Sequence, residues 1–408
     1  MVDALDPLRK AAPFPGGIAP SYDGHGLINV AHTALAALGV PAGPGLAAEF
    51  LPPELTRGVE RVLLVLVDGL GWEQLRATSD KLALRDAGKE GVLAPITSVS
   101  PSTTTSAIAT LLTGEPPIRH GMLGYRLYLR EVGGVANMIR FGPVTGGASF
   151  DTRGFEPRAF FSTPTIFERA RAAGVHAAVV TRKDYVGSAL SKMLHAGSAT
   201  EGFASMSDMG VLAQRALAGG KRSLVFAYWD LLDGIAHRYG ALGEEYRAEL
   251  SLLDHALDRQ FFSRRGDGKT LILLTGDHGH INVPPENRLD VRQTPGVLDD
   301  LLLPPAGEPR LAYLYAKSGR KEALQETLLQ AYGKVGAVLP ADESIRRGYF
   351  GSGPPHAAAA DRLGDLHLMP TRDHAFLFPF PGEKGDLIGR HGGFTPEEML
   401  VPLLAVRR

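Results

Sequence analysis

The chain of 408 residues is long enough for one large domain, or for one domain with sizeable insertions. Lys and Arg number 43 against 44 Asp and Glu, and this balance argues against nucleic-acid polymers and membrane surfaces as partners. The absence of cysteine excludes disulfides, thiolate metal sites and a cysteine nucleophile. The N-terminus lacks an apolar signal segment, and no stretch approaches the roughly 20 apolar residues of a membrane span, so a cytoplasmic location is expected.

Four short apolar runs are typical of strands buried on both faces, because they are rich in Val, Leu and Ile without strict alternation. These runs are residues 61–67, 176–181, 223–229 and 270–276. Segments with helical character lie between them, at 167–174, 208–220 and 244–262. Strands that alternate with helices predict an α/β fold with a mostly parallel central sheet and helices on both of its faces.

Two regions depart from this alternation. Residues 121–160 are rich in Gly, Arg and aromatic residues and have no helical period. Residues 281–375 contain Pro-rich loops, one predicted strand at 310–316 and one predicted helix at 320–333. We therefore expect a catalytic domain at 1–280 and 376–408, with 281–375 inserted as a smaller α+β subdomain.

Polar residues follow the predicted strands where each strand ends. Asp68 comes directly after the first strand, and Asp233 and His237, four residues apart, follow the third. In open α/β sheets this edge is where ligands bind. Taken singly, Asp68 could instead cap a helix, and Asp233 with His237 could be a solvated surface pair.

Stronger signals follow the fourth strand and appear near the C-terminus. Asp277 and His278 stand between glycines in GDHG, where a charged pair has no packing purpose. His280 is either an outer residue that supports the ligands or a plain loop residue. His391 precedes a Gly pair, and the capping box that begins at Thr395 does not explain it. Three Asp and three His gathered at one edge suit divalent metal ions, with zinc expected and manganese as an alternative.

A hydroxyl-rich turn enters a helix of small residues at 99–114. Hydroxyls can cap a helix, but a helix N-terminus also stabilises phosphate, and a metal-bound hydroxyl is an activated nucleophile. Chemistry alone does not choose among five candidates, which are Ser102, Thr103, Thr104, Thr105 and Ser106.

These motifs, taken in order, resemble the alkaline phosphatase superfamily and, within it, the nucleotide pyrophosphatase/phosphodiesterase branch. VDGLG, a hydroxyl turn ending in L-x-T-G, D-x-x-x-H, GDHG and a late HGG with E-E-M-x-V-P all occur between Asp68 and the C-terminal region. In the family the nucleophile lies ten residues before the Gly of L-x-T-G, here Gly114, which selects Thr104. The resemblance implies two metal sites, one formed by Asp233, His237 and His391, the other by Asp68, Asp277, His278 and the hydroxyl of Thr104.

The resemblance implies hydrolysis of a phosphodiester or nucleotide pyrophosphate bond through a phospho-threonine intermediate. Two dications balance three carboxylates and a threonine alkoxide, and a neutral site favours a singly charged diester over a dianionic monoester. No basic residue of the motifs takes the part of the Arg that clamps monoesters in alkaline phosphatase. The sequence departs from the diesterase branch at Ala107, where that branch has an Asn that holds a phosphate oxygen. The backbone N–H of Thr105 is a candidate replacement.

Substrate contacts are predicted at two places. Arg182, Lys183 and Tyr185 follow the second strand at the ligand-binding edge, although a solvated loop is the simpler explanation of these residues. Tyr125 and Arg126 follow the nucleophile helix and are similar candidates.

The expected partner is a small phosphorylated molecule, nucleotide-like or another diester. The alternatives are a phosphonate hydrolase such as phosphonoacetate hydrolase, a phosphomonoesterase, a phosphoryl transferase or mutase, and a metal-bearing binding module without turnover. A complete ligand set beside an intact nucleophile turn argues against the binding module. The sequence gives no oligomeric state.

Overall fold

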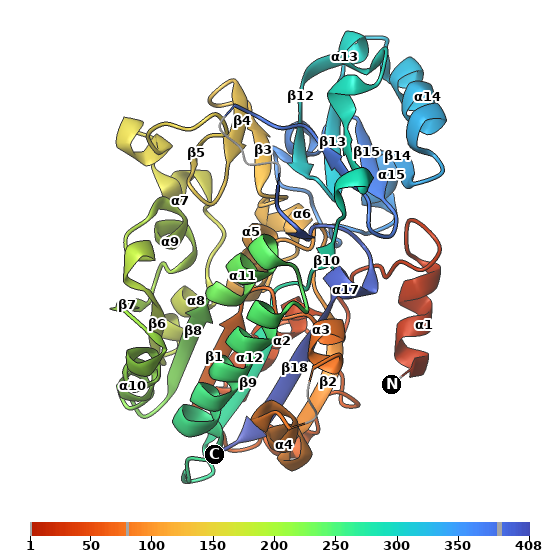
Figure 1. The fold of residues 1–408 in the computed structure, drawn as a ribbon. Coiled ribbons are helices and arrows are strands. Elements are labelled where there is room, and N and C mark those ends of the chain that lie inside the picture. Colours follow the sequence, from red (N-terminus) through yellow and green to blue (C-terminus); the bar gives the residue numbers. More distant parts are fainter. Residues whose placement is uncertain (1, 79–80, 382–385) are drawn as a thin grey trace.

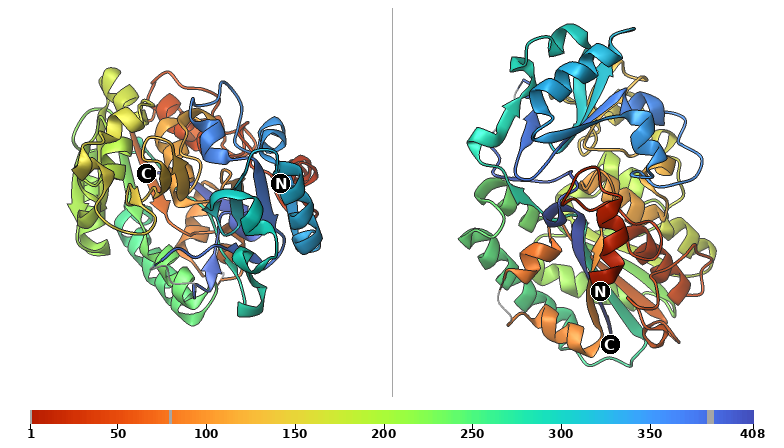
Figure 2. Two further views of the ribbon diagram at one scale, coloured as in Figure 1. Left: turned by 90° about the horizontal axis from the view of Figure 1, so that it is seen from above. Right: turned by 90° about the vertical axis from the view of Figure 1, so that its right-hand side faces the viewer.

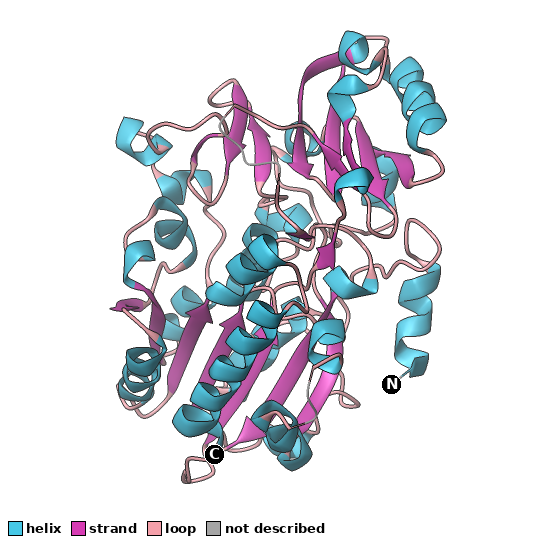
Figure 3. Ribbon diagram, in the orientation of Figure 1, coloured by secondary structure: helices cyan, strands magenta, loops and turns pink. Residues whose placement is uncertain are grey.

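The computed structural model describes residues 2–78, 81–381 and 386–408, and its main body is a seven-stranded central sheet with helices on both faces (Figure 1). Figure 3 shows a second sheet beyond one end of the central one. In spatial order the central strands are β2 (Val92–Thr97), β18 (Leu400–Arg407), β9 (Thr270–Gly276), β1 (Arg61–Val67), β8 (Ser223–Trp229), β6 (His176–Arg182) and β7 (Ala199–Phe203).

The central sheet is mixed in strand direction. Strands β9, β1, β8, β6 and β7 run parallel, whereas β18 pairs antiparallel with both β9 and β2. All four predicted strands are present, and β2, β7 and β18 are additional. Val67 at the end of β1 lies opposite Trp229 and Gly276, so the three central strands end at the same level.

Both faces of the sheet are buried, which explains why the strands are apolar throughout. In β1, Val62 and Leu64 join one core, while Leu63 and Val65 join the core on the opposite face. The first core includes side chains of α2 (Leu27–Ala37), α5 (Thr104–Thr113), α8 (Ile166–Ala172) and α9 (Ala189–Leu194). The second includes α3 (Trp72–Arg76), α4 (Ala83–Glu90), α10 (Met206–Leu217), α11 (Leu231–Tyr239) and α12 (Glu244–Leu257).

The second sheet is antiparallel and packs over one end of the main body (Figure 2). In spatial order its strands are β14 (Gly336–Pro340), β15 (Leu366–Pro370), β13 (Leu311–Ala316), β12 (Leu301–Glu308), β3 (Arg126–Leu129), β4 (Gly134–Asn137) and β5 (Gly142–Pro143). It therefore combines the two regions that depart from the strand–helix alternation. The division into a catalytic domain and an inserted subdomain at 281–375 stays a prediction.

One expectation about this sheet is wrong. The Pro-rich segment LLPPAGEP at 302–309, expected to be a loop, lies in strand β12 except for its last residue, and the pairing of β12 with β13 shifts register around the two prolines. Proline cannot donate to a strand ladder, so it is found where pairing is irregular. The predicted strand at 310–316 and helix at 320–333 are present as β13 and α14 (Lys321–Tyr332).

Short elements complete the chain. The remaining helices are α1 (Val2–Lys10), α6 (Pro117–His120), α7 (Pro157–Phe160), α13 (Val297–Asp300), α15 (Ala341–Arg346), α16 (Ala359–Leu363) and α17 (Pro396–Met399). Two-stranded pairs join β10 (Ile281–Asn282) to β17 (Gly389–Arg390) and β11 (Arg288–Asp290) to β16 (Ala375–Leu377). Among the described residues, no helix is long and apolar enough to cross a membrane.

Candidate active site

The site is built at the edge of the sheet where β1, β8 and β9 end together. Asp68 follows β1 directly, Asp277 follows β9, and Asp233 lies in the first turn of α11, which follows β8. Gly69 has a positive φ of 76°, and a Cβ there would come within 2.8 Å of the Cα of Asp233. Only glycine tolerates both the left-handed backbone and this close approach.

One group of metal-ligand side chains forms around Asp233. Its Oδ1 lies 3.4 Å from Nε2 of His237, 3.0 Å from Nε2 of His280 and 3.7 Å from Nε2 of His391. The donor atoms of these four residues all lie within 4.8 Å of one another. The structure therefore brings together the predicted set of Asp233, His237 and His391, and it adds His280.

A second group lies beside the first. Nε2 of His278 is 3.4 Å from Oδ1 of Asp68, 3.4 Å from Oδ2 of Asp277 and 3.2 Å from Oγ1 of Thr104. The ring of His278 stacks on the ring of His391, with centroids 3.6 Å apart, so the two groups adjoin. All seven residues predicted to hold metals thus lie in one continuous cluster.

The histidines are oriented by their second ring nitrogen. Nδ1–H of His237 donates to the carbonyl of Gly389 at 2.7 Å, and that of His391 donates to the carbonyl of Ser102 at 3.1 Å. Nδ1–H of His278 donates to the carbonyl of the next residue at 3.2 Å. These bonds leave each Nε2 unprotonated and directed at the carboxylates, which is how proteins usually prepare histidine to bind a metal.

Each of the three carboxylates has an oxygen atom without a hydrogen-bond partner among the described residues. Oδ1 of Asp68, Oδ1 of Asp233 and Oδ2 of Asp277 are buried and have no hydrogen-bond partner among the described residues. Buried polar atoms are rarely left in this state. Burial and the nearby charges of Asp277 and Asp233 raise the pKa of Asp68 well above its ordinary value. A divalent cation would relieve both the repulsion and the lost hydrogen bonds.

The distances between donor atoms fit such ions. Zinc binds nitrogen and oxygen at about 2.0–2.1 Å, so the donors of a tetrahedral site lie about 3.3 Å apart. The six separations given above range from 3.0 to 3.7 Å. Burial also lowers the pKa of His237, His278 and His391, which keeps the imidazoles neutral, as metal binding requires.

The hydroxyl groups of the turn before α5 differ in their partners and in their burial. Ser102 Oγ donates to the carbonyl of Gly393 at 2.8 Å, and the hydroxyl of Thr103 hydrogen-bonds to buried Glu308. The other hydroxyl groups at the start of α5 belong to buried side chains, except that of Thr104, which is partly exposed and faces His278. Thr104 is the first residue of α5, so free N–H groups of the first helical turn lie beside its hydroxyl.

The residues predicted to contact substrate occupy different positions. Arg182 ends β6 with its guanidinium 3.5 Å from Asp230, and Tyr185 donates its hydroxyl to the same carboxylate. The Tyr185 ring lies 6.3 Å from that of Tyr228, which borders the metal-ligand cluster. Lys183 is exposed and makes no hydrogen bond or ion pair with the cluster among the described residues.

The two candidates after the nucleophile helix lie where the second sheet meets the site. Tyr125 donates its backbone N–H to Glu308 at 2.7 Å, and its hydroxyl accepts a hydrogen bond from Asn137 at 2.6 Å. Arg126 begins β3, and its guanidinium lies 5.1 Å from the centroid of the Phe380 ring. Thr105, the last candidate, is a buried residue of α5.

Two residues were missed by the sequence reasoning. Tyr228 donates its hydroxyl to Oδ2 of Asp68. Glu308, at the end of β12, accepts a hydrogen bond from Thr103. It also lies close to Gly392, because a Cβ added at Gly392 would come within 2.8 Å of the Cβ of Glu308. The position of Tyr228, one residue before the end of a strand at the ligand-binding edge, was an available signal. Glu308 had none, because its strand was taken for a loop.

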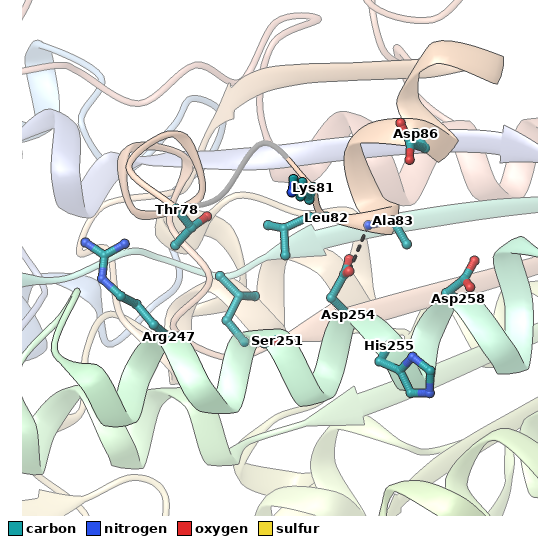
Figure 4. Close-up of a pocket in the computed structure, with 11 residues that line it drawn as sticks. Thr78, Lys81, Leu82, Ala83, Asp86, Arg247, Ser251, Asp254, His255 and Asp258 are labelled. Atoms are coloured by element: carbon teal, nitrogen blue, oxygen red, sulfur yellow. Dashed lines mark hydrogen bonds between the residues drawn. The ribbon is translucent and has the colours of Figure 1, made fainter.

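A separate groove lies between α4 and α12 (Figure 4). Both carboxylate oxygens of Asp254 accept backbone N–H groups at the start of α4, from Ala83 at 2.8 Å and Leu84 at 2.9 Å. This is ordinary helix capping, and the groove contains none of the metal-ligand candidates.

Comparison with known proteins identifies the family. Residues 62–394 match the family described as type I phosphodiesterase / nucleotide pyrophosphatase. Human ectonucleotide pyrophosphatase / phosphodiesterase 5 has a similar structure, with 18% identity and a TM-score of 0.66 over 85% of this chain and 87% of that one. The murine protein, solved in an inactive form with AMP, gives 18% identity and a TM-score of 0.64 over 85% and 88%.

A bacterial enzyme is equally similar in fold. Phosphonoacetate hydrolase from Sinorhizobium meliloti 1021, solved with phosphonoformate, has 21% identity and a TM-score of 0.64 over 85% of this chain and 90% of that one. No curated protein sequence matches the chain. Because the family match covers most of the chain and its range includes all six predicted Asp and His ligands and Thr104, the protein belongs to the type I phosphodiesterase / nucleotide pyrophosphatase family.

Proposed function

We propose that the protein is a two-metal hydrolase that cleaves phosphodiester or nucleotide pyrophosphate bonds through a covalent intermediate on Thr104. One observation carries this proposal: two groups of metal-ligand side chains adjoin, and His278 of one group lies 3.2 Å from the hydroxyl of Thr104 at the N-terminus of α5. Asp233, His237 and His391 would hold one ion. Asp68, Asp277, His278 and Thr104 would hold the other.

The roles of the chain's own residues follow from their positions. Thr104 Oγ attacks phosphorus, and the leaving oxygen departs from the opposite side. The N–H groups at the start of α5, including that of Thr105, stabilise the charge on the phosphoryl oxygens. Divalent ions bound here would lower the pKa of the attacking hydroxyl and stabilise the leaving oxygen. Water then cleaves the phospho-threonine ester, which in a diester substrate still carries the retained alkoxy group.

The expected substrate is small, because the net charge of −1 gives no general attraction to polyanions. Phosphonate hydrolysis is the second candidate, supported by the structural similarity to an enzyme solved with phosphonoformate. Ala107, in place of the Asn typical of the diesterase branch, weakens the case for diesters specifically. Phosphomonoesterase and transferase activities are less well supported, and the cytoplasmic location remains a prediction.

The nucleophile is tested by replacing Thr104 with Ala. Turnover should be abolished while bound metal persists, and Thr104→Ser should retain part of the activity because it keeps a hydroxyl. Thr113→Ala, at the far end of the same helix, is the matched control. Mass spectrometry of enzyme quenched with acid during diester turnover should find a peptide in which Thr104 carries the phosphoryl group together with its retained alkoxy group. Unchanged turnover in Thr104→Ala would refute the assignment.

The bond type is tested by parallel assays with zinc and with manganese. The substrates are bis-p-nitrophenyl phosphate, p-nitrophenyl phosphate, a nucleoside monophosphate p-nitrophenyl ester and phosphonoacetate. We expect the diesters to be cleaved fastest. Dominant cleavage of the monoester or of phosphonoacetate would overturn the diesterase proposal and leave a metal-dependent hydrolase of another class.

A further inference from the structure

We propose that His280 is a fourth protein ligand of the ion held by Asp233, His237 and His391. This inference rests on the proposed function only in that it needs a metal at this cluster. It adds a ligand that the family resemblance does not supply, because the resemblance assigns only three residues to this site.

The position of His280 is the first argument. Nε2 of His280 lies 3.0 Å from Oδ1 of Asp233, closer than Nε2 of either His237 or His391. Its ring centroid lies 5.1 Å from that of His237 and 5.2 Å from that of His391. The three imidazole nitrogens lie 3.0 to 3.7 Å from Oδ1 of Asp233, and all four donor atoms lie within 4.8 Å of one another, which brings the four within reach of a single zinc ion.

The second argument is that the ring is buried without hydrogen bonds. The His280 side chain is 0% exposed, Nδ1 has no hydrogen-bond partner within the described part of the chain, and Nε2 has only Oδ1 of Asp233 nearby, at 3.0 Å without good hydrogen-bond alignment. A buried polar atom left unsatisfied costs about 1–3 kcal/mol. A histidine that only filled space would therefore be a poor choice here, whereas a metal bond would satisfy Nε2.

The third argument is that neighbouring residues make room for this ring. A Cβ at Gly69 would come within 2.8 Å of Cε1 of His280. The side chain of Gln74 donates to the backbone carbonyl of His280 at 2.5 Å, which fixes the loop from the opposite side. The same glycine that admits Asp233 thus also admits His280.

A competing role for His280 is to donate Nε2–H to Asp233 and only orient that carboxylate. The donation would occupy the same oxygen, Oδ1, that faces His237 and His391. If His280 binds the metal instead, Oδ1 of Asp233 stays available to bind the same ion. The two roles differ in what they predict for a glutamine at position 280, because a glutamine amide can hydrogen-bond to Asp233 but is a weak zinc ligand.

A ligand set of three imidazoles and one carboxylate affects which metal the site prefers. Imidazole suits zinc, whereas manganese prefers carboxylate and water oxygens. The site around Asp233 should therefore discriminate more strongly for zinc than the site around Asp68, which has two carboxylates and one imidazole.

The test measures zinc binding directly, by competition with a chromophoric chelator and by metal analysis of the dialysed protein. His280→Ala and His280→Gln should both weaken one of the two zinc sites by at least about tenfold. His367→Gln is the matched control, because His367 is also fully buried but lies in the second sheet, with Nε2 bonded to the carbonyl of Leu363 at 3.0 Å. Affinities in His280→Ala within about twofold of wild type would overturn the inference, as would full recovery in His280→Gln.

A zinc-loaded crystal structure of the wild-type protein decides the matter without any variant. Anomalous scattering should place zinc about 2.0–2.1 Å from Nε2 of His280. An ion bound by the other three residues, with His280 beyond bonding distance, would refute the inference while leaving the proposed function intact. Conversely, an inert enzyme in which His280 binds zinc would refute the proposed hydrolysis alone.

Discussion

A buried ion pair joins the second sheet to the segment that follows His391. Arg310 lies in the turn between β12 and β13, and Glu398 lies in α17. Their side chains are both 0% exposed, with Nε to Oε1 at 2.9 Å and Nη2 to Oε2 at 2.6 Å. Glu398 also accepts from the N–H of Gly393 at 2.9 Å and from the hydroxyl of Thr395 at 2.8 Å.

Replacing Arg310 with Met should strongly destabilise the protein. Met fills much of the volume but leaves a buried carboxylate without its cation, and breaking such a pair costs about 3–5 kcal/mol. Burial acts to raise the pKa of Glu398, and Arg310 together with the hydroxyl and N–H donors outweighs burial and lowers it. In Arg310→Met, we expect burial to prevail and the pKa of Glu398 to rise above its unfolded value.

This change gives the loss of stability a definite pH dependence. In wild type the lowered pKa means that the contribution of Glu398 is present above its unfolded pKa and is lost as pH falls through the folded pKa. In the variant the folded state favours the neutral acid. The destabilisation is then complete above the raised pKa and shrinks as pH falls toward about 4.3, the ordinary Glu value.

Urea unfolding of the metal-free proteins at several pH values measures these effects. Arg76→Met is the matched control, because Arg76 is 60% exposed and contacts Glu73, 28% exposed, at 2.9 Å. That pair is partly solvated, so we expect its loss to cost at most about 1 kcal/mol. A loss below about 1 kcal/mol for Arg310→Met at pH 8, or a loss that grows on acidification, would refute the reasoning.

Three other changes test the surroundings of the site. Burial raises the pKa of Glu308 to about 7. The free energy of unfolding of the wild type should therefore fall by roughly 3 kcal/mol as pH rises from about 4.5 to about 7. Urea unfolding of Glu308→Gln should show no such pH dependence. Tyr228→Phe deprives Asp68 of a hydrogen bond, and chelator competition should show zinc affinity about 10–100-fold weaker; an unchanged affinity would contradict this role. In steady-state kinetics, Arg182→Ala should raise KM while Lys183→Ala, at an exposed position, should not; equal effects would count against Arg182 as a substrate contact.

The central sheet could be predicted where strands are apolar on both faces. The run 61–67 satisfies that pattern fully, and it is β1. Strand β18 was not predicted, because its sequence follows a helix-starting motif and contains Pro402, which argues against a strand. In the structure Pro402 lies opposite Pro95 of β2, so it occupies a sheet position that local propensity disfavours and tertiary packing imposes.

The metal-ligand candidates were predictable for a related reason. Asp68, Asp233 and Asp277 follow strands whose ends coincide, and polar residues there have no packing role. His280 stands two residues after His278 in the same loop, but sequence spacing alone did not reveal whether its ring turns toward the cluster. That orientation depends on the space left by Gly69, which is distant in sequence.

The second sheet explains why part of the site lay beyond sequence reasoning. Glu308 and Arg310 are two residues apart at one β-turn, yet one reaches the residue before Thr104 and the other reaches the helix after His391. Neither residue belongs to a motif, and the strand before them contains two prolines. Their contacts arise only because β12 pairs with β3, which follows the nucleophile helix. The turn therefore ties the nucleophile and the His391 segment to one support, and a change in the second sheet should alter catalysis without touching any metal ligand.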